Sequence, residues 1–119
     1  MFSTKALERI KTIIKKIEFI QAIIDEYGGT DKALEDEQYG RAAILMHLTS
    51  IGEQFDKLLH NGDLDVLAFF EKEDIKGSYN LRNFIAHDYE GIDLYIVEDV
   101  IDKRLPIILE NAKEVLEQT

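Results

Sequence analysis

The spacing of apolar residues near the start of the chain predicts an amphipathic helix. Isoleucines recur there at steps of three and four residues, with charged side chains between them, and the stripe consists of Ile10, Ile13, Ile14, Ile17, Ile20 and Ile24. We place this helix from about Thr4 to Tyr27. The pair Gly28-Gly29 ends it, because glycine readily takes the left-handed backbone conformation that closes a helix.

A second helical region is predicted from Thr30, a suitable N-cap, to His60, with Gly40 as the point where it could break. Its expected buried side consists of Ala43, Met46, Leu48, Ile51, Phe55, Leu58 and Leu59. The turn signal Asn61-Gly62-Asp63 then leads into a short apolar helical segment, which contains Leu64, Val66, Leu67, Phe69 and Phe70.

Two further helices are predicted in the rest of the chain. Lys76-Gly77-Ser78 marks an interruption, after which Ser78 caps a short helix through about His87. Asp93 caps the last helix, whose inward side is expected to contain Ile96, Val100, Leu105, Ile108, Leu109 and Val115. Pro106 lies inside this pattern and should kink the helix, because proline lacks a backbone donor and clashes with the preceding turn.

These elements together predict the fold class. The chain shows no alternating run typical of a strand and no internal repeat. We therefore expect an all-α antiparallel bundle of four to five helices. A length of 119 residues with 45% hydrophobic residues suits one domain with one core over residues 1–119.

The charge of the chain limits how it can meet nucleic acid. There are 14 Lys and Arg residues against 24 Asp and Glu residues, a formal net charge of −10, and nonspecific affinity for phosphate comes from basic side chains. Residues 1–20 are the exception, because five bases and two acids fall there. Any contact with RNA is therefore expected to be local.

The absence of cysteine excludes thiol catalysis and Cys-based metal sites, and it makes the cytoplasm the default location. No apolar run approaches the ~20 residues of a spanning helix. The lysine-bearing first segment also differs from a secretory signal. We expect a soluble, cytoplasmic protein without a membrane partner.

The segment from residue 81 to residue 89 contains the residues most suited to chemistry. At about 100° per residue, Arg82, Asn83 and His87 share one arc of a helix. We call these three residues the polar arc. The opposite arc is expected to lie in the core and consists of Leu81, Phe84 and Ile85. Asn83 and His87 are one turn apart and can therefore touch.

The polar arc suits a phosphodiester. Arginine offers a planar, permanently charged fork that matches phosphate oxygens, and histidine, with a pKa of ~6.5, can transfer protons near neutral pH. No metal or other cofactor is implied, because His87 lacks further ligands at metal-binding spacing, and Asp88 and Glu90 do not supply them. There is also no glycine-rich phosphate loop.

Each of these residues also has a purely structural interpretation. His87 could cap the end of its helix, Arg82 could form a surface ion pair with Asp88 or with an acid on a neighbouring helix, and Tyr89 could pack at the edge of the bundle. Asn83 could be a solvated helix residue. Glu53 is expected to pair with a neighbouring helix or with Arg82, and two further histidines, His47 and His60, are read as structural.

The same segment resembles the signature of HepT-like toxins in the HEPN superfamily. That signature is an arginine, four intervening residues, a histidine, one residue and a tyrosine, with a polar residue after the arginine, and it is matched by Arg82, Asn83, His87 and Tyr89. Residues 42–53 resemble the second helix of the family, and the segment from Ile92 through the Pro106 helix resembles its last helix. The similarity covers roughly the whole chain in the right order.

The resemblance implies a homodimeric, metal-independent endoribonuclease in which two motif helices face each other across a cleft. In that family the 2′-hydroxyl of RNA attacks the adjacent phosphate and leaves a cyclic phosphate and a 5′-hydroxyl. By this similarity His87 is the general acid or base, Arg82 stabilises charge on the phosphate, and Asn83 orients His87 or the phosphate. It also implies a partner, an MntA-type nucleotidyltransferase antitoxin that silences the toxin by transferring AMP to Tyr89.

The net charge of −10 keeps a second function open. Either the dimer gathers Arg82 and the lysines of the first helix into one positive strip, or the protein is a non-catalytic helical adaptor that positions substrate for a nucleotidyltransferase. The intact polar arc favours the ribonuclease, because an adaptor has no need of a histidine at that place.

Overall fold

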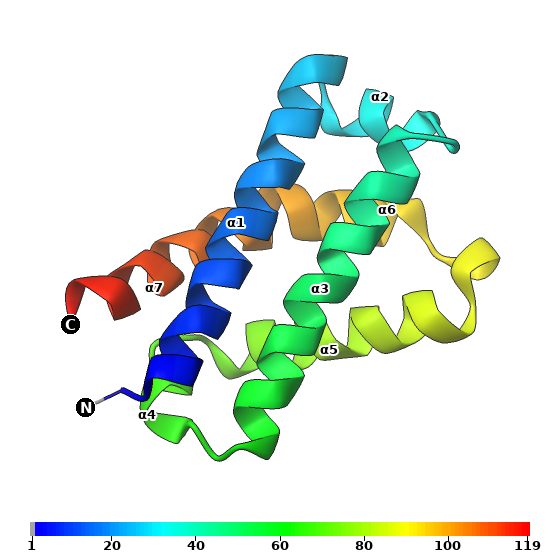
Figure 1. The fold of residues 1–119 in the computed structure, drawn as a ribbon. Helices are drawn as coiled ribbons and strands as arrows, with labels where there is room; N and C mark the ends of the chain where they lie inside the picture. Colours follow the sequence, from blue (N-terminus) through cyan, green and yellow to red (C-terminus); the bar gives the residue numbers. More distant parts are fainter. Residues whose placement is uncertain (1) are drawn as a thin grey trace.

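The computed structural model describes residues 2–119 and is helical, with no strand in that range (Figure 1). The predicted all-α class is therefore confirmed. The longer helices are α1 (Thr4–Tyr27), α3 (Gly40–His60), α5 (Lys72–His87) and α7 (Leu105–Glu117). The shorter elements are α2 (Thr30–Glu35), α4 (Leu64–Leu67), the 3₁₀ turn η1 (Tyr89–Gly91), α6 (Leu94–Asp99) and the π-helical segment η2 (Val100–Arg104).

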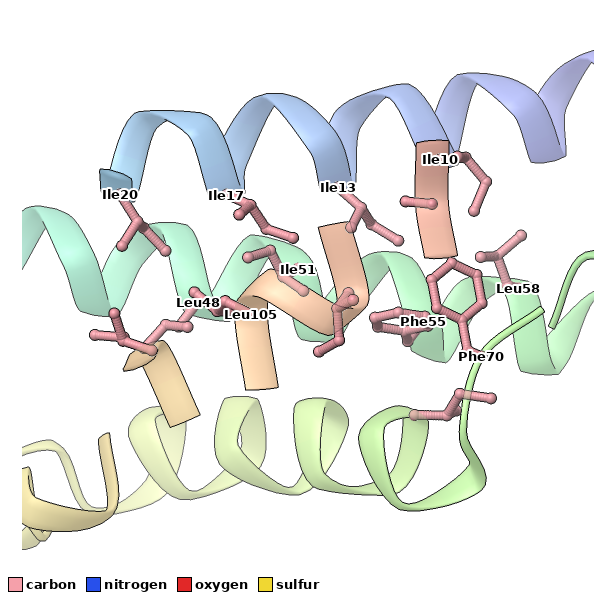
Figure 2. Packing of buried hydrophobic residues seen from close by; sticks show 14 of the residues in the cluster. Ile10, Ile13, Ile17, Ile20, Leu48, Ile51, Phe55, Leu58, Phe70 and Leu105 are labelled. Atoms are coloured by element: carbon pink, nitrogen blue, oxygen red, sulfur yellow. The ribbon is translucent and has the colours of Figure 1, made fainter. Parts of the chain in front are cut away.

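Helices α1 and α3 lie side by side and antiparallel, and α5 and the α6–α7 segment lie behind them (Figure 1). The isoleucine stripe of α1 points into the space between these layers, where it meets side chains of α3, including Ile51 and Phe55 (Figure 2). The ring of Phe55 packs edge-on against Phe70, with the centroids 5.0 Å apart. This core holds α3 firmly, and α3 in turn positions α5.

The ends of α1 agree with the predicted bounds. The side chain of Ser3 accepts a hydrogen bond from the backbone N–H of Ala6 at 3.0 Å, and this contact caps the first turn. Gly28 closes the helix with a φ of 80°, in the left-handed region. Both signals are local in the sequence, and for this reason they could be read without the tertiary structure.

The predicted region from Thr30 to His60 is interrupted. Gly29, not Thr30, is the N-cap of α2, and α3 begins at Gly40 after a short loop. A side chain at Gly40 would collide with the backbone oxygen of Ala33, so a glycine is needed where the chain folds back. The break expected at Gly40 is therefore present, whereas the N-cap role expected for Thr30 is wrong.

Three side chains expected on buried faces are exposed: Met46 by 66%, Leu59 by 39% and Ile96 by 57%. They lie on sides of their helices that the rest of residues 2–119 covers only in part. The apolar stripe predicts that a helix has a buried side, but its centre depends on where the neighbouring helices pack.

Helix α5 begins at Lys72, and its N-cap lies seven residues before Ser78, the predicted N-cap, so this prediction is wrong. Glu71 is the N-cap, and acidic residues in the first turn favour helix formation through the helix dipole. Gly77 lies within α5, where a Cβ would meet nothing within 4 Å, so the interruption expected around it does not occur.

The last helix begins as predicted, because the Asp93 carboxylate accepts a hydrogen bond from the Tyr95 backbone N–H at 2.9 Å. The kink expected at Pro106 takes the form of the π-helical segment η2, which ends just before it. The N–H of Leu105 donates to the carbonyl of Val100, five residues back. Since Pro106 has no N–H, the regular ladder is interrupted at this point.

An ion pair with one buried partner, the carboxylate of Asp74, joins this segment to α5. Arg104, the last residue of η2, donates from Nε and Nη2 to the two carboxylate oxygens of Asp74, each at 2.8 Å. Asp74 is only 5% exposed. The bidentate contact raises the pKa of Arg104, chiefly through the hydrogen bond to Asp74, so the guanidinium stays charged. It ties the first turn of α5 to the C-terminal half of the chain.

Candidate functional site

All members of the polar arc lie on α5, which crosses α3 at close range. A Cβ placed on Gly52 of α3 would lie 2.5 Å from the Ser78 carbonyl oxygen and 2.5 Å from the Cβ of Arg82. The missing side chain therefore allows α5 to approach at the level of Arg82. Ile85, which is 7% exposed, anchors the same side of α5 one turn later.

The guanidinium of Arg82 is held between two side chains. Its Nη1 donates to Oδ1 of Asn83 at 3.1 Å, and its Nη2 lies 3.9 Å from Oε2 of Glu53 on α3. The Arg82 side chain is 36% exposed, so the group is steadied yet open to a ligand. The expected ion pair with an acid on a neighbouring helix is therefore present, and its partner is Glu53.

His87 is the last residue of α5 and is exposed. Within residues 2–119 its imidazole forms no hydrogen bond or ion pair. His87 and Asn83, which were expected to touch, therefore share no hydrogen bond. The polar arc therefore consists of a joined Arg82–Asn83 pair and a free imidazole about one turn along the helix. A free imidazole on a rigid helix can accept or donate a proton.

Tyr89 opens the η1 turn, two residues beyond His87, and is 37% exposed. The backbone N–H of Asp88 donates to the carbonyl of Phe84 at 2.8 Å and closes α5. The Asp88 carboxylate occupies the space where a side chain on Gly91 would sit, so η1 folds tightly. This turn holds Tyr89 next to the polar arc, at the surface.

The apolar arc predicted for α5 is only partly correct. Ile85 is buried and Leu81 is half-buried, but Phe84 is 48% exposed. The side of α5 that packs on α3 passes through Ile75, Ser78, Arg82 and Ile85, and this stripe leaves Phe84 outside the contact. Arg82 therefore lies at the edge of the helix–helix contact and not opposite to it.

Phe84 lies at a surface groove between α5 and α6 with a volume of about 300 Å³. Ile96 also lines the groove, and its side chain is exposed as well. The polar arc therefore adjoins an open apolar surface.

Gly52 is the positioning residue that the sequence interpretation missed. The signal was present, because a glycine inside an otherwise helical pattern often marks a close approach of another segment. Its partner could not be read from the sequence, since Ser78 and Arg82 lie 26 and 30 residues further along.

Two other general features bear on the site. No cluster of three or more histidine or acidic residues that could hold a metal ion is found in residues 2–119. Over the same residues, no helix has the length and apolar character needed to cross a membrane.

Comparison with known proteins identifies the family. No curated protein and no solved structure matches the chain. The family model described as ribonuclease HepT-like matches residues 5–115, nearly the whole chain. This protein therefore belongs to the HepT-like ribonuclease family.

Proposed function

We propose that this protein is a metal-independent endoribonuclease toxin whose active site is built from Arg82, Asn83 and His87. The observation that carries the proposal is the guanidinium of Arg82, held by Asn83 and Glu53 at an exposed edge of α5, about one turn from a free imidazole. Family membership supports ribonuclease activity in general. The geometry supports the roles of the individual residues.

In the proposed reaction His87 takes the proton from the 2′-hydroxyl of the substrate. The 2′-oxygen then attacks the adjacent phosphorus, and the bond to the 5′-oxygen breaks as that oxygen receives the proton that His87 carries. The products are a 2′,3′-cyclic phosphate and a 5′-hydroxyl. Arg82 stabilises the negative charge that develops on the phosphate oxygens, and Asn83 keeps the guanidinium oriented.

Cleavage of RNA by the purified protein tests the proposal. We expect cleavage to survive a metal chelator, to yield cyclic phosphate ends, and to be lost in His87→Ala and in Arg82→Ala. His60→Ala is the matched control, because His60 is also an exposed histidine at the end of a helix, paired there with Asp56. Abolition by the chelator, or full activity of His87→Ala, would contradict the mechanism.

We also propose that the protein acts as a homodimer through the surface beside the polar arc. The support is the exposed apolar surface of Phe84 and Ile96 along the α5–α6 groove. Burying it against a second copy would bring two polar arcs, and so two Arg82 guanidinium groups, together. Phe84→Asp should yield monomers by light scattering and lose cleavage, whereas Tyr39→Asp, at an exposed aromatic that does not line the groove, should do neither. An active wild-type monomer would contradict this assignment.

The proposed antitoxin is a nucleotidyltransferase of the MntA type that modifies Tyr89. The phenolic oxygen of Tyr89 would attack the α-phosphorus of ATP, releasing pyrophosphate and losing its proton. The attached phosphate would then compete with RNA for Arg82. Tyr89→Phe should escape silencing, and Tyr95→Phe, at an even more exposed tyrosine, is the control. Mass spectrometry that finds AMP on another residue would refute the assignment.

The net charge of −10 favours one alternative, a non-catalytic adaptor that positions substrate for the nucleotidyltransferase. The cleavage assay separates the two functions, because an adaptor would leave RNA intact at every protein concentration.

A further inference from the structure

A surface pocket with a volume of about 640 Å³ lies where the end of α3, α4 and the first half of α5 meet. Its buried lining is apolar and consists of Leu67, Phe70 and Ile75, each less than 10% exposed. Leu59 and Leu64 also line it and are exposed by 39% and 66%. Sites for small organic ligands have volumes of about 300–1,000 Å³, so this pocket is large enough to enclose one. We call it the α4 pocket.

The charge at the α4 pocket is positive. Its charged lining residues are Lys72 and Lys76, and no acidic residue of the range 2–119 lines it. Both lysines are exposed, and within the described residues neither forms an ion pair. Asp56, one turn before Leu59 on α3, already lies 3.4 Å from Nδ1 of His60. In a chain with ten more acids than bases, this combination suits a ligand with an apolar part and an anionic part.

The lysines share one face of α5 with two members of the polar arc. Residues at steps of four and three lie on the same side of a helix, and those on this face are Lys72, Lys76, Tyr79, Asn83 and His87. At about 100° per residue they fall within about 80° of the helix circumference. Lys76 and Asn83 are seven residues apart, which corresponds to about 10 Å along the axis. A chain-like ligand held at the polar arc can therefore reach the α4 pocket along a single helix face.

A nucleotide has the chemistry that the α4 pocket fits. The flat faces of its base are apolar and pack well on aromatic and apolar side chains, and its phosphate is an anion that lysine binds. Tyr79 lines the pocket and is half-buried, so its ring offers such a surface. An acidic, amphipathic segment of another protein has similar chemistry. The shared face of α5 favours RNA, because one strand would then contact the pocket and the polar arc together.

We propose that the α4 pocket binds a base of single-stranded RNA next to the reacting phosphate, with Lys72 and Lys76 contacting phosphates of the same strand. This inference rests on the proposed ribonuclease function, because it assigns the part of the substrate that the polar arc does not hold. It also accounts for how a chain of net charge −10 receives a polyanion. The contacts are concentrated on one face of α5, where four of the five residues are basic or neutral polar groups and none is acidic.

The test measures binding of a labelled, unstructured RNA strand to the full chain carrying His87→Ala, so that cleavage does not interfere. Adding Leu64→Ser removes an exposed apolar wall of the pocket and should weaken binding about 5-fold, the lower end of the range for one base contact. Met46→Ser is the matched control, because Met46 is also 66% exposed and does not line the pocket.

The same assay at several salt concentrations tests the lysines. Adding Lys76→Ala should reduce the slope of log affinity against log salt by about 0.7, the value for one phosphate contact on a single strand. Lys113→Ala, at an exposed lysine outside the pocket, should leave the slope unchanged. Circular dichroism confirms that each variant is folded.

The outcomes separate this inference from the proposed function. If the wild-type protein cleaves RNA while Leu64→Ser and Lys76→Ala bind it as their controls do, the pocket assignment is overturned and the ribonuclease stands. If the wild-type protein cleaves nothing but both variants lose RNA affinity as expected, the pocket assignment stands and the ribonuclease falls. If Leu64→Ser changes the molar mass measured by light scattering and leaves RNA affinity intact, the pocket is a protein interface and the assignment is overturned. Absence of RNA binding by the His87→Ala chain would overturn it as well.

Discussion

Replacing Gly52 with alanine adds one methyl group at the contact between α3 and α5. The new Cβ would lie 2.5 Å from both the Ser78 carbonyl oxygen and the Arg82 Cβ. Ordinary contacts of this kind begin near 3.4 Å, so the helices must separate locally by about 0.9 Å. Both neighbours are held rigidly, one of them being backbone, so the strain cannot be relieved by rotating a flexible side chain.

The stability effect combines two opposing terms. Overpacking of this kind costs about 1–3 kcal/mol, and alanine regains up to about 1 kcal/mol over glycine through its helix propensity. We expect Gly52→Ala to lower the free energy of unfolding by up to about 2 kcal/mol, or up to about 8 °C in Tm. If the proposed active site is correct, the loss of cleavage should be larger, because a displacement of ~1 Å at a catalytic group can cost about 100-fold in rate.

Gly77 provides the matched control, since it lies within α5 and a Cβ there would meet nothing within 4 Å. Gly77→Ala should therefore raise stability by about 0.5–1 kcal/mol. Urea unfolding followed by circular dichroism, at one fixed protein concentration, measures both variants. Cleavage assays on the same samples complete the test. A Gly52→Ala protein as stable and as active as wild type would refute the idea that this contact positions Arg82.

Two further predictions follow from ionisable groups. Arg104→Ala leaves the buried carboxylate of Asp74 unpaired and should lower the free energy of unfolding, measured in urea, by about 3–5 kcal/mol. Lys103→Ala is the control, at an exposed pair with Asp99, and should lower it by under about 1 kcal/mol. Equal losses of stability in the two variants would contradict the proposed importance of burial. Burial, and secondarily Lys16, lowers the pKa of His47 below 6.5. The unfolded chain therefore binds more protons than the folded chain near this pKa. The contribution of His47 to stability is complete above pH ~6.5 and is lost as the pH falls through its pKa in the folded state. His47→Gln should remove this part of the pH dependence. If wild type and His47→Gln differ in free energy of unfolding by the same amount at every pH, His47 titrates normally and the prediction is wrong.

Local signals were sufficient for much of the helical pattern. The bounds of α1 follow from the serine cap and the left-handed glycine, and the start of α6 follows from Asp93, because a cap acts on backbone groups only a few residues away. The all-α class follows from the spacing of apolar residues. The order of Arg82, Asn83, His87 and Tyr89 was likewise visible in the sequence, and it indicated the family to which the chain belongs.

The start of α5 could not be read in this way. The glycine and serine at residues 77–78 have turn character, but the helix runs through them from Lys72. Its first turn is tied by Asp74 to Arg104, which lies 30 residues away. A contact of this kind overrides local preference, because a tertiary interaction worth a few kcal/mol exceeds the difference in propensity of one or two residues.

Which side of α5 faces the core was also decided by tertiary structure. The sequence shows that Phe84 and Ile85 are both apolar, yet Ile85 is buried and Phe84 is exposed. The difference arises because Gly52 of α3 admits α5 along the line of Ser78 and Arg82. Apolar spacing determines that a helix has a buried side, but the direction of that side depends on the surface of a helix distant in the sequence. The exposure of the polar arc and of Phe84 was therefore decided only by the packing of α5 against α3.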